Sequence, residues 1–159
     1  MNPTITYLIG PPASGKSTYR YKYAKNEVII SRDDIRDELR EKIGISYEDT
    51  FYYTDFDKNV NSILQNNIYE AIKNRNDMII DMSNISLSSR RKIMSRIPLL
   101  YIRKAVVFRV DYDELVIRIK KRGEETGKFI PIKILNWMIS QYEEPSEEEN
   151  FSEIKYIKS

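Results

Sequence analysis

The segment spanning residues 10–17 constrains the fold of this chain more than any other part of the sequence. It reads GPPASGKS, which fits the pattern G-x-x-x-x-G-K-[ST], and it follows the short apolar run at residues 5–9. Glycines let the backbone curl so that successive N–H groups point at phosphate oxygens, and the helix that follows adds the positive end of its dipole. The segment therefore predicts a buried strand, a phosphate-binding loop and a helix, in that order.

The loop residues are the candidate nucleotide-binding residues. Lys16 is suited to neutralising β- and γ-phosphate oxygens, and the hydroxyl of Ser17 is suited to ligating Mg²⁺. The alternative is a chance Gly/Pro turn before a helix, but the junction of a strand and a helix is where the motif is expected. We therefore expect ATP to contact Gly10, Pro11, Pro12, Ala13, Ser14, Gly15, Lys16, Ser17 and Thr18.

Composition restricts the chemistry that is available. The 159 residues include neither Cys nor His, which excludes disulfides, thiolate nucleophiles, His bases and zinc sites of the Cys/His kind. Proton transfer falls mainly to Asp, Glu, Lys or Tyr. The formal net charge of +2 is too small to indicate nucleic-acid binding by itself. No apolar run is long enough to cross a bilayer and no signal-peptide pattern is present, so a cytoplasmic location is expected.

Apolar periodicity predicts strands that alternate with helices along the chain. The predicted strands span residues 5–9, 28–31, 78–81, 105–110 and 154–157. The predicted helices span residues 16–25, 32–42, 55–74, 86–96, 113–121 and 131–142, with a loop at 44–54. This alternation predicts a three-layer α/β fold with a parallel sheet of about five strands, judged from the βα pattern. We expect residues 1–159 to form a single domain.

The second predicted strand ends in a charged sequence, SRDDIR at residues 31–36. Ligands of open α/β sheets bind beyond the carboxyl ends of the strands, and a carboxylate there can accept the proton of an attacking hydroxyl. Asp33 is therefore a candidate general base. Arg36 follows three residues later on the same helical face and could hold a phosphate of the acceptor. Alternatively, Asp33 or Asp34 caps the helix and the arginines are solvated.

Two further groups of residues are candidates for the site. Asp81 ends the third strand, with Asn84 close behind, and could hold Mg²⁺-bound water or anchor a cation; alternatively, it caps the next helix. Arg118 and Arg122 lie four residues apart before a polar, Gly-containing stretch. They suit a lid over about residues 118–131 that closes on the nucleotide, or else a solvated basic face.

The sequence as a whole resembles the kinase domain of phage-type 5′-hydroxyl polynucleotide kinases, within the P-loop kinase superfamily. GPPASGKST and ISRDDIR carry the resemblance, including the spacing between them. IIDMSN at 79–84, ELVIRIKKRG at 114–123 and IPIKILNWM at 130–138 extend it over most of the chain. The resemblance implies a P-loop kinase fold with a helical lid, ATP and Mg²⁺ as cofactors, and DNA or RNA 5′ ends as substrate.

The resemblance also implies roles for individual residues. Asp33 matches the general base and Arg36 the contact to the acceptor's 3′-phosphate. Arg122 matches the lid arginine, Arg118 a nucleotide-side arginine, and Asp81 an important acidic residue of the site. Many such proteins carry a phosphatase or ligase domain as well. This chain is too short to hold one, so we expect any such activity to come from a separate protein.

Two other functions remain open from the residues alone. A kinase of the same architecture could act on a modified DNA base, a nucleoside or a small metabolite, because the base and loop would be shared. A nucleotide-switched binding module without phosphotransfer would share the loop only. The sequence discriminates poorly between the acceptors.

Several remaining features favour structural roles. A basic cluster, which could guide a polynucleotide but which we expect to be solvated, consists of Arg90, Arg91, Lys92 and Arg96. Packing or surface exposure is favoured over base stacking for Tyr47, Tyr52 and Tyr53. Trp137 is expected in the core, and the acidic stretch at 143–149 is expected to be solvated.

Overall fold

The computed structural model describes the backbone of residues 1–159 and every side chain except those of Glu48 and Phe51. Five strands form one sheet in the order β2-β3-β1-β4-β5, and every neighbouring pair is parallel. The strands are β1 (Thr4–Ile9), β2 (Val28–Ser31), β3 (Met78–Asp81), β4 (Ile102–Arg109) and β5 (Glu153–Lys158). The prediction of a parallel sheet of about five strands is confirmed.

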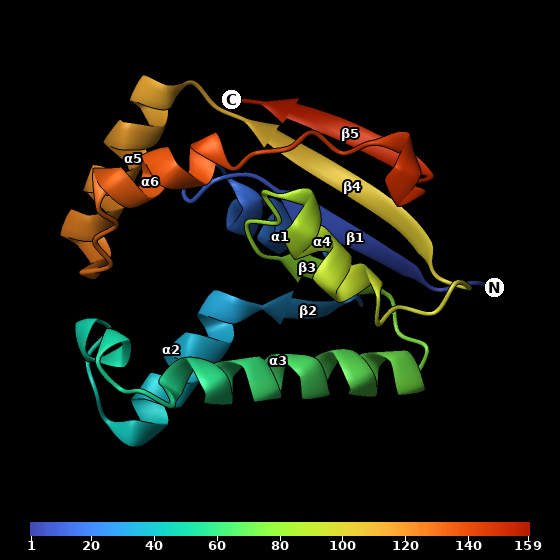
Figure 1. Ribbon diagram of the computed structural model, residues 1–159, viewed down its shortest axis with the longest axis horizontal. Helices are drawn as coiled ribbons and strands as arrows, with labels where there is room; N and C mark the ends of the chain where they lie inside the picture. The colour runs from blue at the N-terminus through green and yellow to red at the C-terminus, as the bar shows by residue number, and fades with distance from the viewer.

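Six α-helices connect and cover the strands (Figure 1). They are α1 (Lys16–Tyr23), α2 (Arg32–Ile43), α3 (Phe56–Lys73), α4 (Leu87–Met94), α5 (Tyr112–Thr126) and α6 (Ile132–Ser140). Two short 3₁₀ helices are η1 (Glu48–Phe51), which lies in the predicted loop at 44–54, and η2 (Glu147–Glu149). Among the helices of the described chain, none is long and apolar enough to span a bilayer.

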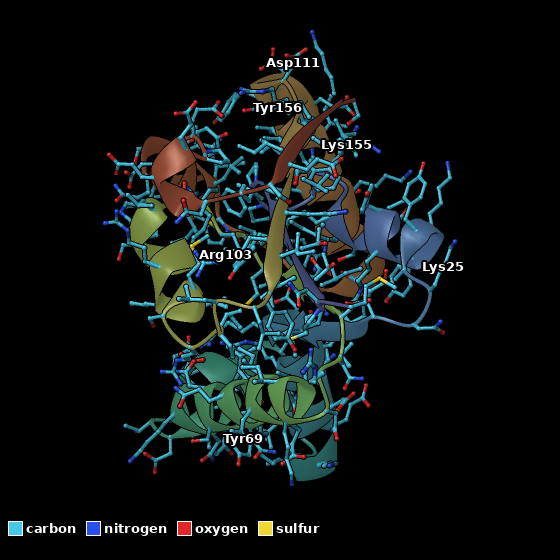
Figure 2. All side chains as sticks on the ribbon, turned by 90° about the vertical axis from the view of Figure 1, so that its right-hand side faces the viewer. Lys25, Tyr69, Arg103, Asp111, Lys155 and Tyr156 are labelled. Carbon is cyan, nitrogen blue, oxygen red and sulfur yellow. The ribbon has the colours of Figure 1, made fainter. Side chains whose placement is uncertain are left out.

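Apolar side chains on both faces of the sheet form separate clusters. On one face, Val60 and Leu64 of α3 and Ile93 of α4 pack with strand residues such as Ile5. On the other face, Tyr19 of α1 packs on a cluster that the sheet supplies: Leu8, Ile79, Val106 and Phe108. The sheet is therefore the middle of three layers, with α1 on one side and α3 and α4 on the other. Figure 2 shows α1 and α4 on opposite sides of the strands.

Helix α2 begins at a side-chain cap. The hydroxyl of Ser31 accepts a hydrogen bond from the Asp34 backbone N–H at 3.3 Å, which satisfies one of the free donors of the first turn. The alternative that Asp33 or Asp34 caps this helix is therefore wrong. Both carboxylates instead lie in the first turn, where they complement the helix dipole. Gly44 ends the helix in the left-handed conformation, with φ of 80°.

Helix α5 is longer than its predicted range of 113–121. It continues through Gly123 to Thr126 and ends at Gly127, whose φ is 75°. Glycine inside a helix usually costs stability, but here it makes room for an aromatic ring. A Cβ atom on Gly123 would lie 2.5 Å from the ring of Phe129, which folds back against the helix. Strand β4 also begins three residues earlier than predicted, at Ile102.

Three predictions about burial are wrong, those for Trp137, Arg90 and Glu149. Trp137 is 61% exposed, and the buried residue of α6 is Leu135 instead, packed against α5. Arg90, expected on a solvated surface, is fully buried, because it forms an ion pair with Glu149 at 2.6 Å. Glu149 is likewise buried rather than solvated. The other members of the basic cluster are exposed.

Candidate active site

The phosphate loop joins β1 to α1 at the carboxyl edge of the sheet. Gly15 has φ of 104° and Ala13 has φ of 63°, so both take left-handed conformations as the loop turns. A Cβ atom on Gly10 would lie 2.6 Å from the Ser14 hydroxyl oxygen, which is too close. The Gly10 N–H donates to the carbonyl oxygen of Ser83 at 3.0 Å, which ties the loop to the segment after β3.

Lys16 lies inside the curve of this loop. Its ammonium group donates to the carbonyl oxygens of Gly10 and Pro11, each at 2.8 Å. Burial lowers the pKa of Lys16 to about 8, although the nearby charges of Asp81 and Asp33 oppose that shift. The side chain is thus held at the loop, close to both carboxylates.

Ser17 and Asp81 form the next layer of the site. The Ser17 hydroxyl donates to the Asp81 carboxylate at 3.1 Å. Asp81 is buried at the end of β3, and burial raises the pKa of its carboxyl while the charges of Arg20 and Lys16 lower it. The alternative that Asp81 caps the following helix is wrong, because Ser86 caps α4 in a reciprocal pair with Ser89.

This pair of oxygen ligands fits a magnesium–nucleotide complex. The described residues contain no cluster of three or more His, Cys, Asp or Glu side chains that would hold a metal alone. Mg²⁺ usually takes one or two protein oxygens, together with water and substrate phosphates. The Ser17 hydroxyl, exposed beside the loop and bonded to Asp81, is the group that would hold it.

Arg20 is a residue that the sequence analysis missed. It lies on α1, 5% exposed, with Nε 3.2 Å from Asp81 and Nη2 2.7 Å from Asp34. The available signal was its position four residues after Lys16, which places both on one face of the helix. The phosphate-loop pattern ends at Ser17, so it does not indicate a role for Arg20.

Asp33 and Arg122 meet across the site. The Asp33 carboxylate is exposed in the first turn of α2, and Nη2 of Arg122 lies 3.8 Å from it. Arg122 lies on α5, which continues to Thr126 rather than ending at residue 121 as predicted. Arg118, one turn earlier, donates to the Ala13 carbonyl oxygen in the phosphate loop at 3.3 Å. Arg122 therefore reaches the candidate base, and Arg118 reaches the phosphate loop.

The segment after α5 also contacts α2. The ammonium of Lys128 pairs with the carboxylate of Asp37 and lies 5.7 Å from the centre of the Tyr47 ring. Burial opposes ionisation of Asp37, but hydrogen bonds from Lys128 and Arg40 hold the pKa of its carboxyl below the ordinary value. With the Arg122 contact, this gives the predicted lid two attachments to the helix that carries Asp33.

Arg36 follows Asp33 by three residues on α2, and its charge, like those of Asp33 and Arg122, acts on Tyr47. It is 8% exposed, donates to the Thr50 hydroxyl at 3.0 Å and forms an ion pair with Asp57. Its guanidinium lies 5.3 Å from the centre of the Phe56 ring. The residue therefore packs against the segment that joins α2 to α3 and against the start of α3.

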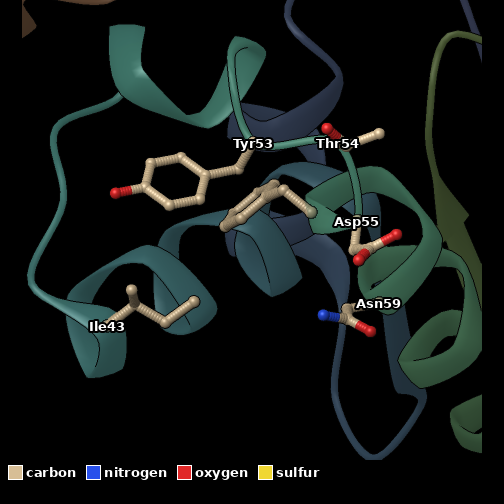
Figure 3. A pocket seen from close by; sticks show the side chains of 6 residues that line it. Ile43, Tyr53, Thr54, Asp55 and Asn59 are labelled. Carbon is tan, nitrogen blue, oxygen red and sulfur yellow. The ribbon is translucent and has the colours of Figure 1, made fainter.

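A hollow lies between the end of α2 and the start of α3 (Figure 3), and its lining includes Phe56, whose ring lies near Arg36. It is lined by Ile43, Tyr53, Thr54, Asp55, Phe56 and Asn59. Figure 3 shows the Tyr53 ring on the Ile43 side of this hollow, and the ring is 54% exposed. Tyr52 is more exposed still, at 84%, so both rings are accessible.

Asn84 has a structural environment. It is 4% exposed, takes a left-handed conformation with φ of 50°, and donates through its amide to the carbonyl oxygen of Leu8 at 2.8 Å. The same amide contacts the carbonyl oxygens of Ile80 and Met82. These contacts hold the segment after β3 against β1, and direct binding of substrate by Asn84 stays a prediction.

Comparison with known proteins identifies the family. Residues 5–145 match a family described as an AAA domain. The chain belongs to this family. Members share the phosphate-loop architecture found here, so the match fits the geometry of residues 10–17.

Individual proteins similar to this AAA domain include kinases and a chain of an RNA repair assembly. The L-seryl-tRNA(Sec) kinase of Methanococcus maripaludis is 27% identical over 151 residues, covering 89% of this chain and 53% of that protein. A chain of the Pnkp1/Rnl/Hen1 RNA repair complex is 31% identical with a TM-score of 0.73, covering 88% of this chain and 44% of that one. A sugar kinase from Janibacter sp. HTCC2649 shares the fold at 15% identity and a TM-score of 0.65, covering 98% and 85%.

The AAA-domain chain therefore spans about half the length of the first two proteins, 53% and 44%. Together the family match and these similarities support a P-loop kinase. The fold brings most of the predicted site residues to one place: Lys16, Ser17, Asp33, Asp81, Arg118 and Arg122. Arg36 contacts Thr50, Asp57 and Phe56, and Asn84 contacts backbone carbonyl oxygens.

Proposed function

We propose that this chain transfers the γ-phosphate of ATP to the 5′-hydroxyl of RNA or DNA. The observation that carries the proposal is the position of Asp33. Its exposed carboxylate lies at the carboxyl end of the sheet, 3.8 Å from Arg122. It is also close enough to Lys16 for its negative charge to raise the pKa of that ammonium group. A base placed between a phosphate loop and a lid arginine suits transfer to a hydroxyl.

The proposed step is a displacement at the γ-phosphorus. The acceptor hydroxyl oxygen forms a bond to the γ-phosphorus, the bond to the β,γ-bridging oxygen breaks, and ADP leaves. Asp33 accepts the hydroxyl proton. Lys16 and Arg122 neutralise negative charge on the transferring group, and Arg118 supports the loop from α5. Mg²⁺, when bound through Ser17, supplies further charge neutralisation at the phosphates.

Two observations favour a polynucleotide acceptor. The chain of the RNA repair complex is the more similar of the two solved structures compared, at 31% identity. Arg36 also lies near the ring of Phe56, which lines a hollow with an accessible tyrosine, and this combination suits a phosphate and a stacked base. Because that similar chain is part of an assembly, we propose that a separate phosphatase or ligase completes any end repair.

A second candidate acceptor is a hydroxyl on an aminoacyl-tRNA. The similarity to the L-seryl-tRNA(Sec) kinase, 27% identity over 89% of this chain, is the specific observation in its favour. The proton transfer would be the same, with Asp33 as base. Only the group bound beside Arg36 would differ.

A panel of acceptors tests the proposal. Labelled γ-phosphate would be offered from ATP with Mg²⁺ to 5′-hydroxyl RNA, 5′-hydroxyl DNA, seryl-tRNA, nucleosides and modified-base duplexes. Label at an oligonucleotide 5′ end is the expected result. Label on the seryl group or only on a small molecule would replace the acceptor and keep the kinase chemistry. ATP binding without any labelled product would favour a nucleotide-switched binding module.

A further inference from the structure

Arg20 is the buried cation that joins the two halves of the site. Its guanidinium lies 3.2 Å from Asp81 on one side and 2.7 Å from Asp34 on the other, and it also donates to the Tyr21 hydroxyl at 3.0 Å. Asp81 holds the Ser17 hydroxyl, which belongs to the nucleotide side. Asp34 is the neighbour of Asp33, which belongs to the acceptor side.

Burying the guanidinium of Arg20 costs desolvation free energy, which a purely structural role does not explain. Burying a guanidinium requires compensation from well-aligned hydrogen bonds. Within the described side chains, Nε and Nη1 of Arg20 are buried and have no hydrogen-bond partner, because Nε approaches Asp81 without the alignment of a hydrogen bond. An incompletely satisfied buried cation contributes little to stability, which favours a functional role for Arg20.

The geometry gives that role a definite form. Arg20 follows Lys16 by one helical turn on α1, so the helix that carries the phosphate-binding lysine also carries the link. Asp34 lies in the first turn of α2, the turn that carries Asp33. The ion pair therefore fixes the candidate base relative to the phosphate loop across the gap between two helices.

We propose that Arg20 is a positioning residue that holds Asp81 beside Ser17 and fixes the first turn of α2 for phosphotransfer. The proposal rests on the proposed function in taking Asp33 as the base. Small displacements of a catalytic group are costly, on the order of 10²-fold in rate for about 1 Å. The two arms have separable consequences, since one supports nucleotide binding and the other supports the acceptor step.

Three variants separate the two arms. Asp34→Asn removes only the arm to α2, and we expect a fall in kcat of about tenfold to 10²-fold with unchanged affinity for Mg·ATP. Arg20→Met removes both arms, and we expect a fall in kcat together with weaker Mg·ATP binding. Arg20→Lys keeps one buried charge but cannot bridge two carboxylates, so it should restore Mg·ATP binding and not kcat.

The matched control is Glu38→Gln, which removes an exposed negative charge from α2 one turn beyond Asp34. We expect no change in kcat. The double variant Arg20→Met with Asp34→Asn should be no slower than Arg20→Met alone, because both changes break the same link. Multiplied losses in the double variant, or an Asp34→Asn variant with the kcat of the parent, would overturn the proposal.

The readouts also distinguish this proposal from the proposed function. Mg·ATP affinity is measured by titration without any acceptor, and kcat is measured with whichever acceptor the parent labels. If the parent protein labels only a non-polynucleotide acceptor, the proposed acceptor is wrong. The variants of Arg20 and Asp34, measured with that other acceptor, still test the positioning role. Asp34 is half-exposed, so its variant tests the link even if Arg20→Met does not fold.

Discussion

The guanidinium of Arg122 lies 3.8 Å from the carboxylate of Asp33, which brings the end of α5 to the first turn of α2. Both side chains are partly exposed, at 33% and 64%. A partly exposed pair of this kind contributes only about 1 kcal/mol or less to stability. Its value therefore lies in bringing a cation and a candidate base together beside the phosphate loop.

Loss of Arg122 should affect rate far more than stability. We expect Arg122→Ala to lower kcat by roughly 10²–10³-fold, as for the loss of one group that stabilises transition-state charge. The thermal midpoint should hardly change. Lys120→Ala, an exposed cation on the same helix, is the matched control and should keep the kcat of the parent. Equal effects of the two variants would show that Arg122 contributes only general positive charge.

Nucleotide binding should take up a proton above neutral pH. Burial lowers the pKa of Lys16 to about 8, so the free protein loses this charge above that pH, and bound phosphate restores it. Affinity for ATP should therefore be constant below about pH 8 and fall by about tenfold per pH unit above it. Calorimetry in buffers of different ionisation enthalpy measures the proton directly.

The matched variant for this prediction is Lys16→Arg. Its guanidinium remains charged throughout the range, so any binding that it retains should not vary with pH between about 7 and 9.5. A parent protein whose ATP affinity also stays constant over that range would contradict the assigned role of Lys16.

Gly10→Ala should disrupt the phosphate loop. The added Cβ atom would lie 2.6 Å from the Ser14 hydroxyl oxygen and 3.1 Å from the Phe108 Cβ. Removing the first contact with Ser14→Ala leaves the second, so the double variant should recover ATP binding only in part. Titration of ATP measures both variants. Normal affinity in Gly10→Ala would contradict the loop geometry.

The buried pair of Arg90 and Glu149 should dominate the stability of the C-terminal region. Both groups are almost fully buried and form two hydrogen bonds, at 2.6 and 3.2 Å. Glu149→Gln leaves a buried guanidinium without its counter-charge, at a cost of about 3–5 kcal/mol. Urea unfolding measures this loss.

A double-mutant cycle separates this pair from other contacts. Arg90→Met combined with Glu149→Leu removes both charges together, so the double variant should lose much less than the sum of the two single losses. Additive losses would show that the two residues stabilise the protein independently.

The alternation of strands and helices was predictable because local signals carry it. Each buried strand is a short apolar run, and the phosphate loop is defined by eight adjacent residues, 10–17. The candidate base was also predictable, because Asp33 follows directly from the end of β2 in a parallel sheet. These features depend on residues that are close together in the sequence.

The errors concern contacts that local sequence patterns do not show. Arg90 is buried because Glu149, 59 residues away, lies against it, and no periodicity shows that partner. Arg20 likewise depends on Asp81 and Asp34, which lie on other elements. The length of α5 depends on Phe129 packing against Gly123. For Arg90, the charge pattern alone favours a solvated side chain. For α5, the glycine pattern alone favours an earlier end of the helix. For Arg20, the sequence pattern gives no signal.

Transfer of labelled γ-phosphate to a 5′-hydroxyl RNA oligonucleotide, by the parent and by Asp33→Asn, tests the central claim most directly. We predict label at the 5′ end with the parent and a loss of roughly 10²–10⁴-fold with Asp33→Asn, as for the loss of a general base. Affinity for ATP should be retained in the variant. Turnover by Asp33→Asn at the rate of the parent, or label that is absent from the 5′ end, would contradict the account.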